Sequence, residues 1–154
     1  MPVAGWGACL TVHIPDGHSW NHCDRRWLPP VIDSPSHAAV LVVEDDVFER
    51  MGASDIFTDA GYRVLEAGNA DEALRFFETD ADIGLLFTDV SMPGSMSGAD
   101  LARHVAARWP AIGIILASGR PRPDKLPPRM RFHPKPYEPT AVLGHAREMM
   151  LPLA

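Results

Sequence analysis

The chain has 154 residues, 46% of them hydrophobic and 22% charged, and its net charge is −6. These values predict one globular domain of ordinary size with a tail, and they exclude a disordered chain. The acidity argues against nucleic-acid binding, and no stretch approaches the ~20 apolar residues of a membrane span. Because the start also lacks a signal-peptide pattern, we expect a cytoplasmic protein that binds neither nucleic acid nor membrane.

Residues 1–37 are rich in Pro, Gly, His and Trp and show no helical or strand periodicity, which predicts an irregular N-terminal extension. A zinc site is an alternative for this segment, but its potential ligands match no familiar zinc-finger spacing: Cys9, His13, His18, His22 and Cys23. The folded domain is predicted to span residues 38–151.

Strand and helix patterns alternate from residue 38 onward. Strands are predicted at 38–43, 62–66, 83–88, 112–117 and 130–133. Helices are predicted at 47–60, 71–78, 99–109 and 140–151. Because several strands lack a polar face and helical crossovers join parallel strands, we expect a five-stranded doubly wound parallel α/β sheet with helices on both faces.

Local signals mark the ends of these helices. Asp46 and Asn69 each stand three residues before a glutamate, the pattern of a helix N-cap. Gly61 fits the end of the first helix. The punctuation therefore agrees with the alternating pattern.

Acidic residues follow two of the predicted strands. Glu44, Asp45 and Asp46 follow the first strand, and Asp89 follows the third, so all four belong to the carboxyl edge of the sheet. Two carboxylates 4 Å apart repel by about 4 kcal/mol at an effective dielectric of 20, and bound Mg²⁺ or Mn²⁺ would relieve this repulsion. Since Asp46 stands three residues before Glu49, we interpret it as a helix cap and exclude it from the metal site.

Two further polar residues stand at the ends of later strands. Ser118 follows the fourth strand, and Lys135 follows the short fifth strand. A carboxylate nucleophile, a divalent cation, a lysine and a hydroxyl are the groups that phosphoryl transfer to an aspartate requires.

Four motifs carry a resemblance to a known family: Val42-Val-Glu-Asp-Asp46, Leu86-Phe-Thr-Asp-Val-Ser-Met-Pro93, Leu116-Ala-Ser-Gly119 and Pro134-Lys-Pro136. In this order and spacing they resemble the signature of the response-regulator receiver domain of two-component signalling and phosphorelays. The resemblance implies a flavodoxin-like fold. It also implies a domain that accepts a phosphoryl group from a sensor histidine kinase or a histidine phosphotransfer protein and then acts on a downstream protein target.

The resemblance assigns a role to each residue of the acidic site. Asp89 would be the phosphoacceptor and a ligand of Mg²⁺ or Mn²⁺. Asp45 would bind the metal directly, Glu44 through water, and Ser91 through its backbone carbonyl. No enzymatic activity is implied beyond the domain's own phosphorylation and dephosphorylation.

The resemblance also assigns the phosphate-binding and switch residues. Lys135 and Ser118 would each contact a phosphoryl oxygen. Phe132 matches the switch aromatic, although plain core packing is an equal alternative for it. The bond before Pro136 is expected to be cis.

The chain departs from the family between Ser118 and Lys135, where the segment is shorter by about one helical turn. Four prolines in this segment would each break a helix interior: Pro121, Pro123, Pro127 and Pro128. We therefore expect the fourth helix to be degenerate or missing. Since little chain follows residue 151, we also expect a stand-alone receiver.

Two other functions are compatible with parts of the pattern. A pseudo-receiver would bind partners without phosphorylation, but such domains lose an acidic or lysine position that this chain keeps. A haloacid-dehalogenase-like phosphohydrolase also forms an aspartyl phosphate on a parallel sheet, but its nucleophile motif resembles Asp-x-Asp. Ser91 stands where the second aspartate would be.

Overall fold

The computed structural model describes residues 12–13, 19–20, 38–80, 82–122 and 124–151. The chain divides into two compact units, residues 1–34 and 35–154. In the first unit, β1 (Val12–His13) pairs antiparallel with β2 (Ser19–Trp20). The rest of the predicted irregular extension lies outside the described residues, and so does the alternative zinc site, apart from the backbone of His13.

The described residues of the second unit form a five-stranded sheet in the order β4-β3-β5-β6-β7, and every pairing in it is parallel. The strands are β3 (Ala39–Val43), β4 (Val64–Ala67), β5 (Ile83–Asp89), β6 (Gly113–Ser118) and β7 (Met130–Pro134). This topology confirms the predicted doubly wound α/β fold.

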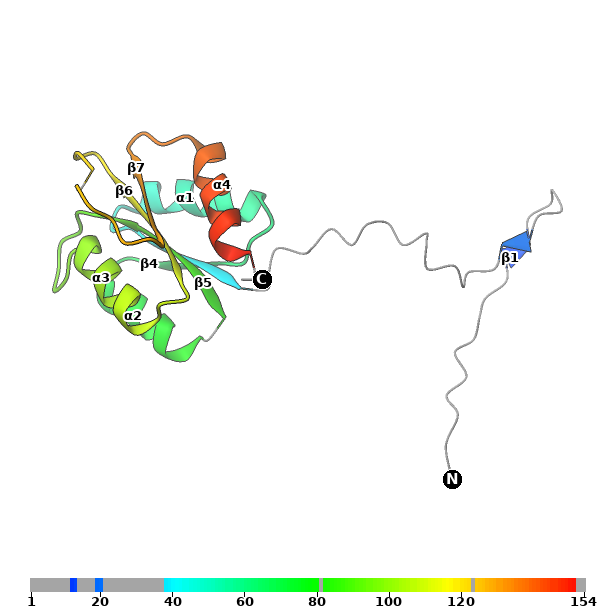
Figure 1. The fold of residues 1–154 in the computed structure, drawn as a ribbon, viewed down its shortest axis with the longest axis horizontal. Coiled ribbons are helices and arrows are strands. Elements are labelled where there is room, and N and C mark those ends of the chain that lie inside the picture. The colour runs from blue at the N-terminus through cyan, green and yellow to red at the C-terminus, as the bar shows by residue number, and fades with distance from the viewer. Residues whose placement is uncertain (1–11, 14–18, 21–37, 81, 123, 152–154) are drawn as a thin grey trace, which may run out of the picture. The chain divides into compact units, whose positions relative to one another are not determined.

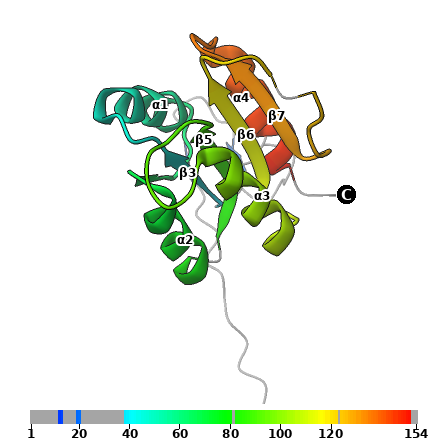
Figure 2. The ribbon, with the colours of Figure 1, turned by 90° about the vertical axis from the view of Figure 1, so that its left-hand side faces the viewer.

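Helices cover both faces of the sheet (Figures 1 and 2). They are α1 (Val47–Asp59), α2 (Ala70–Thr79), α3 (Gly98–Arg108) and α4 (Pro139–Met150). Buried side chains of α1 and α4 pack with one face of the strands, and those of α2 and α3 pack with the other. Each predicted boundary in this unit lies within two residues of the observed one. None of the described helices has the length and apolar character to cross a bilayer.

The helix caps follow the sequence signals. The Asp46 side chain accepts hydrogen bonds from the backbone N–H groups of Phe48 and Glu49, both at 2.9 Å. Asn69 accepts one from the Glu72 backbone, also at 2.9 Å. Gly61, just past α1, has a φ of 90°, which is a left-handed conformation that glycine adopts without strain. Both predicted N-caps are confirmed.

Residues 119–129, here called the proline-rich segment, connect β6 to β7. Its described residues contain no helix, which confirms the prediction that the fourth helix of the family pattern is missing. Leu126 packs against the core cluster on the α2 and α3 face. The Arg129 guanidinium donates to the Met149 carbonyl of α4 at 3.0 Å. These two side chains attach the segment to the domain.

Candidate functional site

Three acidic residues meet at the carboxyl edge of the sheet. Glu44 and Asp45 directly follow β3, and Asp89 is the last residue of β5. One carboxylate oxygen from each lies within 4.8 Å of the others. Because β3 and β5 are neighbouring parallel strands, residues at their carboxyl ends are adjacent in space although far apart in the chain.

Glu44 is the buried member of this cluster, with 5% of its surface exposed, whereas Asp45 is exposed and Asp89 is partly buried. Burial raises the pKa of Glu44 from its ordinary value to about 7, although a hydrogen bond from Lys135 acts in the opposite direction. A bound cation would favour the charged form of this carboxylate.

Lys135 brings positive charge to the cluster from the residue after β7. Its Nζ lies 3.0 Å from Glu44 Oε2 and 3.6 Å from Asp89 Oδ1, and it also donates to the Glu49 carboxylate of α1. Its backbone N–H donates to the Ser118 carbonyl at 2.8 Å, which joins the ends of β6 and β7. The bond from Lys135 to Pro136 is cis.

Burial acts to lower the pKa of Lys135, but hydrogen bonds to Glu49 and Glu44, together with the charges of Glu44 and Asp89, outweigh it and raise that pKa. Lys135 is therefore charged at neutral pH. Its single positive charge faces several carboxylates, so negatively charged oxygen atoms outnumber positive charges at this edge. This donor set fits a hard divalent cation such as Mg²⁺ or Mn²⁺, held by Glu44, Asp45 and Asp89.

Two serines flank the cluster. Ser118 is buried at the end of β6, and its Oγ accepts a hydrogen bond from the Arg120 N–H at 3.0 Å. Ser91 is exposed in the loop after β5. It lines a surface hollow of about 470 Å³ that begins at Val90, the residue next to Asp89, and extends to Arg120.

Two other residues considered for the site have clear positions. Asp46 caps α1 with its carboxylate, and it does not belong to the three-residue cluster that could hold a metal. Phe132 is partly buried and packs against the core cluster of α2 and α3. Its packing does not distinguish a switch aromatic from an ordinary core residue, so its switch role stays a prediction.

The backbone of Asp89 is held by close contact with the start of α3. A Cβ added to Gly98 would lie 1.5 Å from the Asp89 carbonyl oxygen, so no larger residue fits there without movement. The same carbonyl accepts a hydrogen bond from the buried Thr88 hydroxyl at 3.0 Å. Gly98 and Thr88 thus position the strand end that carries Asp89.

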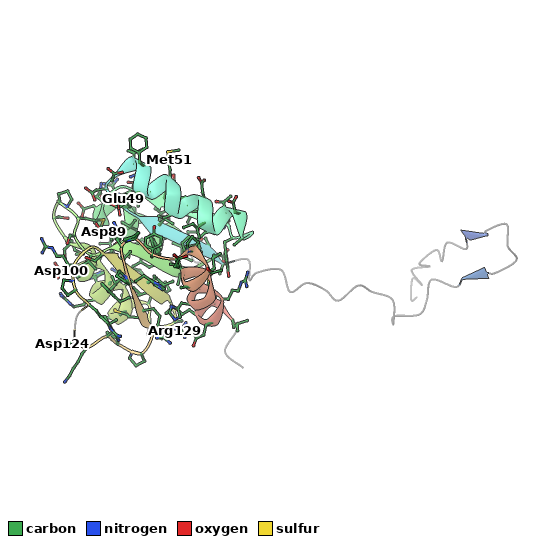
Figure 3. All side chains as sticks on the ribbon, turned by 90° about the horizontal axis from the view of Figure 1, so that it is seen from above. Glu49, Met51, Asp89, Asp100, Asp124 and Arg129 are labelled. Carbon is green, nitrogen blue, oxygen red and sulfur yellow. The ribbon has the colours of Figure 1, made fainter. Side chains whose placement is uncertain are left out.

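Sequence reasoning missed two residues of the site. Glu49 was interpreted only as part of a helix-start signal, but its carboxylate contacts Lys135. Figure 3 shows Glu49 and Asp89 at the same side of the domain. Gly98 was absent from the predicted site because a close backbone approach leaves no signal in a single sequence beyond the glycine itself.

Comparisons with known proteins identify the family. The model of the response regulator receiver domain matches residues 40–127, and the chain belongs to this family. The chemotaxis protein CheY of Thermotoga maritima is 33% identical over 111 residues, which cover 68% of this chain and 90% of CheY. The sensor kinase CckA of Brucella abortus is 32% identical over 124 residues, covering 77% of this chain and 13% of the kinase. The chain spans 23% of the response regulator FleR of Pseudomonas aeruginosa.

Solved structures agree with this assignment. The response regulator receiver protein of Pseudomonas putida aligns with a TM-score of 0.64 and 28% identity, covering 72% of this chain and 96% of that one. The receiver domain of the hybrid histidine kinase CckA aligns with a TM-score of 0.63 and 28% identity, covering 73% and 99%. The chain therefore contains a receiver domain of two-component signalling. Receiver domains interact with kinases and downstream targets, generally use Mg²⁺ at an acidic pocket, and are not enzymes in the usual sense.

Proposed function

We propose that Asp89 accepts a phosphoryl group from a phosphohistidine of a sensor histidine kinase or a histidine phosphotransfer protein. A carboxylate oxygen of Asp89 attacks phosphorus, and a new O–P bond forms while the P–N bond breaks and its electron pair leaves with the imidazole. The observation that carries this proposal is the grouping of Glu44, Asp45 and Asp89, with the Lys135 ammonium 3.6 Å from Asp89.

Two groups beside Asp89, a bound cation and Lys135, would neutralise the negative charge of the phosphoryl oxygens. Glu44, Asp45, Asp89 and the Ser91 carbonyl would hold Mg²⁺ or Mn²⁺, which when bound offsets the negative charge of the phosphoryl oxygens. Lys135 neutralises one phosphoryl oxygen. This arrangement favours the transfer because the phosphoryl group and the carboxylate that it joins are both anionic.

Ser118 is the proposed link from phosphorylation to the rest of the domain. Its hydroxyl accepts from the Arg120 amide and keeps its own proton available for a phosphoryl oxygen. When Ser118 turns toward that oxygen, the start of the proline-rich segment follows it, and Phe132 repacks at the other end. A downstream protein would bind the rearranged surface.

The proposed receiver domain comprises residues 38–151, and its phosphoryl group is lost by attack of water on the aspartyl phosphate. Asp45, Asp89 and Lys135 all remain in place, which favours a phosphorylated receiver over a pseudo-receiver. The site also lacks the second aspartate of a haloacid-dehalogenase-like nucleophile motif, because Ser91 occupies that position.

The test is modification with acetyl phosphate, and occupancy by beryllofluoride, in the presence of Mg²⁺. The native domain should gain one phosphoryl group that maps to Asp89, and Asp89→Asn should gain none. Asp82→Asn, at the opposite end of β5, is the matched control and should behave as the native chain does. Labelling that persists in Asp89→Asn at another residue would refute the assignment.

A further inference from the structure

Glu49 contacts the site without belonging to its acidic cluster. Among the described residues, the Lys135 ammonium contacts the carboxylates of Glu44, Glu49 and Asp89. Of these three, Glu44 and Asp89 are in the group that could hold a cation, and Glu49 is not. A cation bound by that group would engage Glu44 and Asp89, and Glu49 would remain the partner of Lys135.

The side chain of Glu49 is not needed for the helix cap that its sequence position suggests. In a closed capping box it would accept from the Asp46 N–H, but that N–H donates to Glu44 Oε1 at 3.3 Å. The backbone N–H of Glu49 donates to Asp46 Oδ1, so the cap itself requires only the backbone of residue 49. The carboxylate is therefore available to Lys135.

We propose that Glu49 is a positioning residue that holds the Lys135 ammonium in the unphosphorylated domain and competes with the phosphoryl group for it. This inference rests on the proposed function, because the competitor is a phosphoryl oxygen on Asp89. Lys135 Nζ lies 3.6 Å from Asp89 Oδ1 while it contacts Glu49, so the attraction of Glu49 opposes a closer approach of Lys135 to that oxygen. The ion pair between Glu49 and Lys135 thus opposes the phosphorylated state and lowers the affinity of the site for a phosphoryl group.

The exposure of the pair bounds the size of the effect. The Glu49 side chain is 54% exposed and that of Lys135 is 23% exposed. Partly solvated ion pairs are weak, so loss of this one changes an equilibrium by about two- to fivefold. The contact adjusts the occupancy of the site and does not decide whether the chemistry is possible.

The experiment measures beryllofluoride affinity by calorimetry in saturating Mg²⁺. Glu49→Gln, which keeps the size of the side chain and removes its charge, should bind beryllofluoride about two- to fivefold more tightly than the native domain. Asp55→Asn removes the same charge from an exposed position on α1 and should leave this affinity unchanged. The Mg²⁺ affinity of Glu49→Gln, measured alone, should match the native value because Glu49 is not a ligand.

Unchanged or weaker beryllofluoride binding in Glu49→Gln would overturn the inference, and so would an equal gain in Asp55→Asn, which would show a general charge effect. Asp89→Asn, titrated in parallel, separates this inference from the proposed function. If Asp89→Asn binds as the native domain does, the proposed function fails. If Asp89→Asn loses binding and Glu49→Gln is unchanged, only the role of Glu49 fails.

Discussion

The carboxyl edge of the sheet and the proline-rich segment meet at Ser118, but they are held in different ways. At the edge, residues distant in the chain are in direct contact, as with Lys135 Nζ and Glu44 Oε2 at 3.0 Å. In the segment, prolines prevent a helix, and most described residues are exposed. Its side chains attach to the core and to α4 through the packing of Leu126 and the hydrogen bond from Arg129.

This difference separates two parts of a receiver. The strand ends position the acidic cluster and the lysine without a helix between β6 and β7. The segment is mostly exposed and leads directly into β7, so it forms part of the surface of the domain. A chain of this family can thus keep the site and change the surface next to it.

A pair of glycines gives the largest expected contrast between the two regions. At Gly98 an added Cβ would lie 1.5 Å from the Asp89 carbonyl oxygen, whereas at Gly119 it would meet nothing within 4 Å. Gly98→Ala should therefore lower the free energy of unfolding by about 3 kcal/mol, through strain at the strand end. Gly119→Ala should change it by less than about 0.5 kcal/mol.

Chemical denaturation of both variants measures these values directly. Beryllofluoride binding by folded Gly98→Ala should also weaken, since the backbone of Asp89 must move. Equal stabilities for the two variants would contradict the tight contact between α3 and β5.

The next contrast lies within the edge, between neighbouring aspartates. Asp45→Ala should reduce Mg²⁺ affinity by at least ~10- to 100-fold, the range known for residues that only support metal ligands. Asp46→Ala should leave Mg²⁺ affinity nearly unchanged and lower the free energy of unfolding by ~1 kcal/mol, because it removes the N-cap of α1. Calorimetric titration with Mg²⁺ measures the affinity of both variants, and chemical denaturation measures the free energy of unfolding of Asp46→Ala. Equal losses of Mg²⁺ affinity would make Asp46 a ligand.

The raised pKa of Glu44 predicts that the free energy of unfolding depends on pH through the carboxyl edge of the sheet. Its pKa in the folded domain is raised to about 7, so the folded state holds this proton more tightly than the unfolded chain does. Without metal, the contribution of protonated Glu44 to the free energy of unfolding is therefore lost as the pH rises from the ordinary glutamate pKa through about 7. Glu44→Gln should raise the free energy of unfolding by roughly 1–2 kcal/mol at pH 8 and leave it unchanged at pH 4.

Added Mg²⁺ should reverse this order at pH 8, because it stabilises the native domain and has lost one ligand in Glu44→Gln. Denaturation curves at both pH values, with and without Mg²⁺, provide the check. If the native domain is as stable as Glu44→Gln at pH 8 without metal, burial does not disfavour the charged form of Glu44.

The sequence predicted the sheet because its strands are short, apolar and separated by capped helices, signals that act locally. The grouping of Glu44, Asp45 and Asp89 also followed from it, since parallel strands end at one edge. The contact between Glu49 and Lys135 could not be predicted, because it depends on the angle at which α1 leaves β3. The 2.9 Å contact between His133 of β7 and His145 of α4 was also missed, because it depends on how α4 packs against the sheet.

The most local expected effect concerns opening of the proline-rich segment. Few of its described backbone N–H groups have a backbone partner, so its amides should exchange with solvent fast in the unphosphorylated domain, while those of β5 stay protected. Beryllofluoride with Mg²⁺ should slow exchange in residues 119–129 by about tenfold, because Ser118 at one end would be drawn to the ligand. Hydrogen exchange with mass spectrometry of peptides resolves this segment from β5.

Asp89→Asn is the control, and beryllofluoride should not slow exchange of residues 119–129 in this variant. Should the segment be protected from the start, or ignore beryllofluoride in the native domain, it is not the switch and another face must carry the signal.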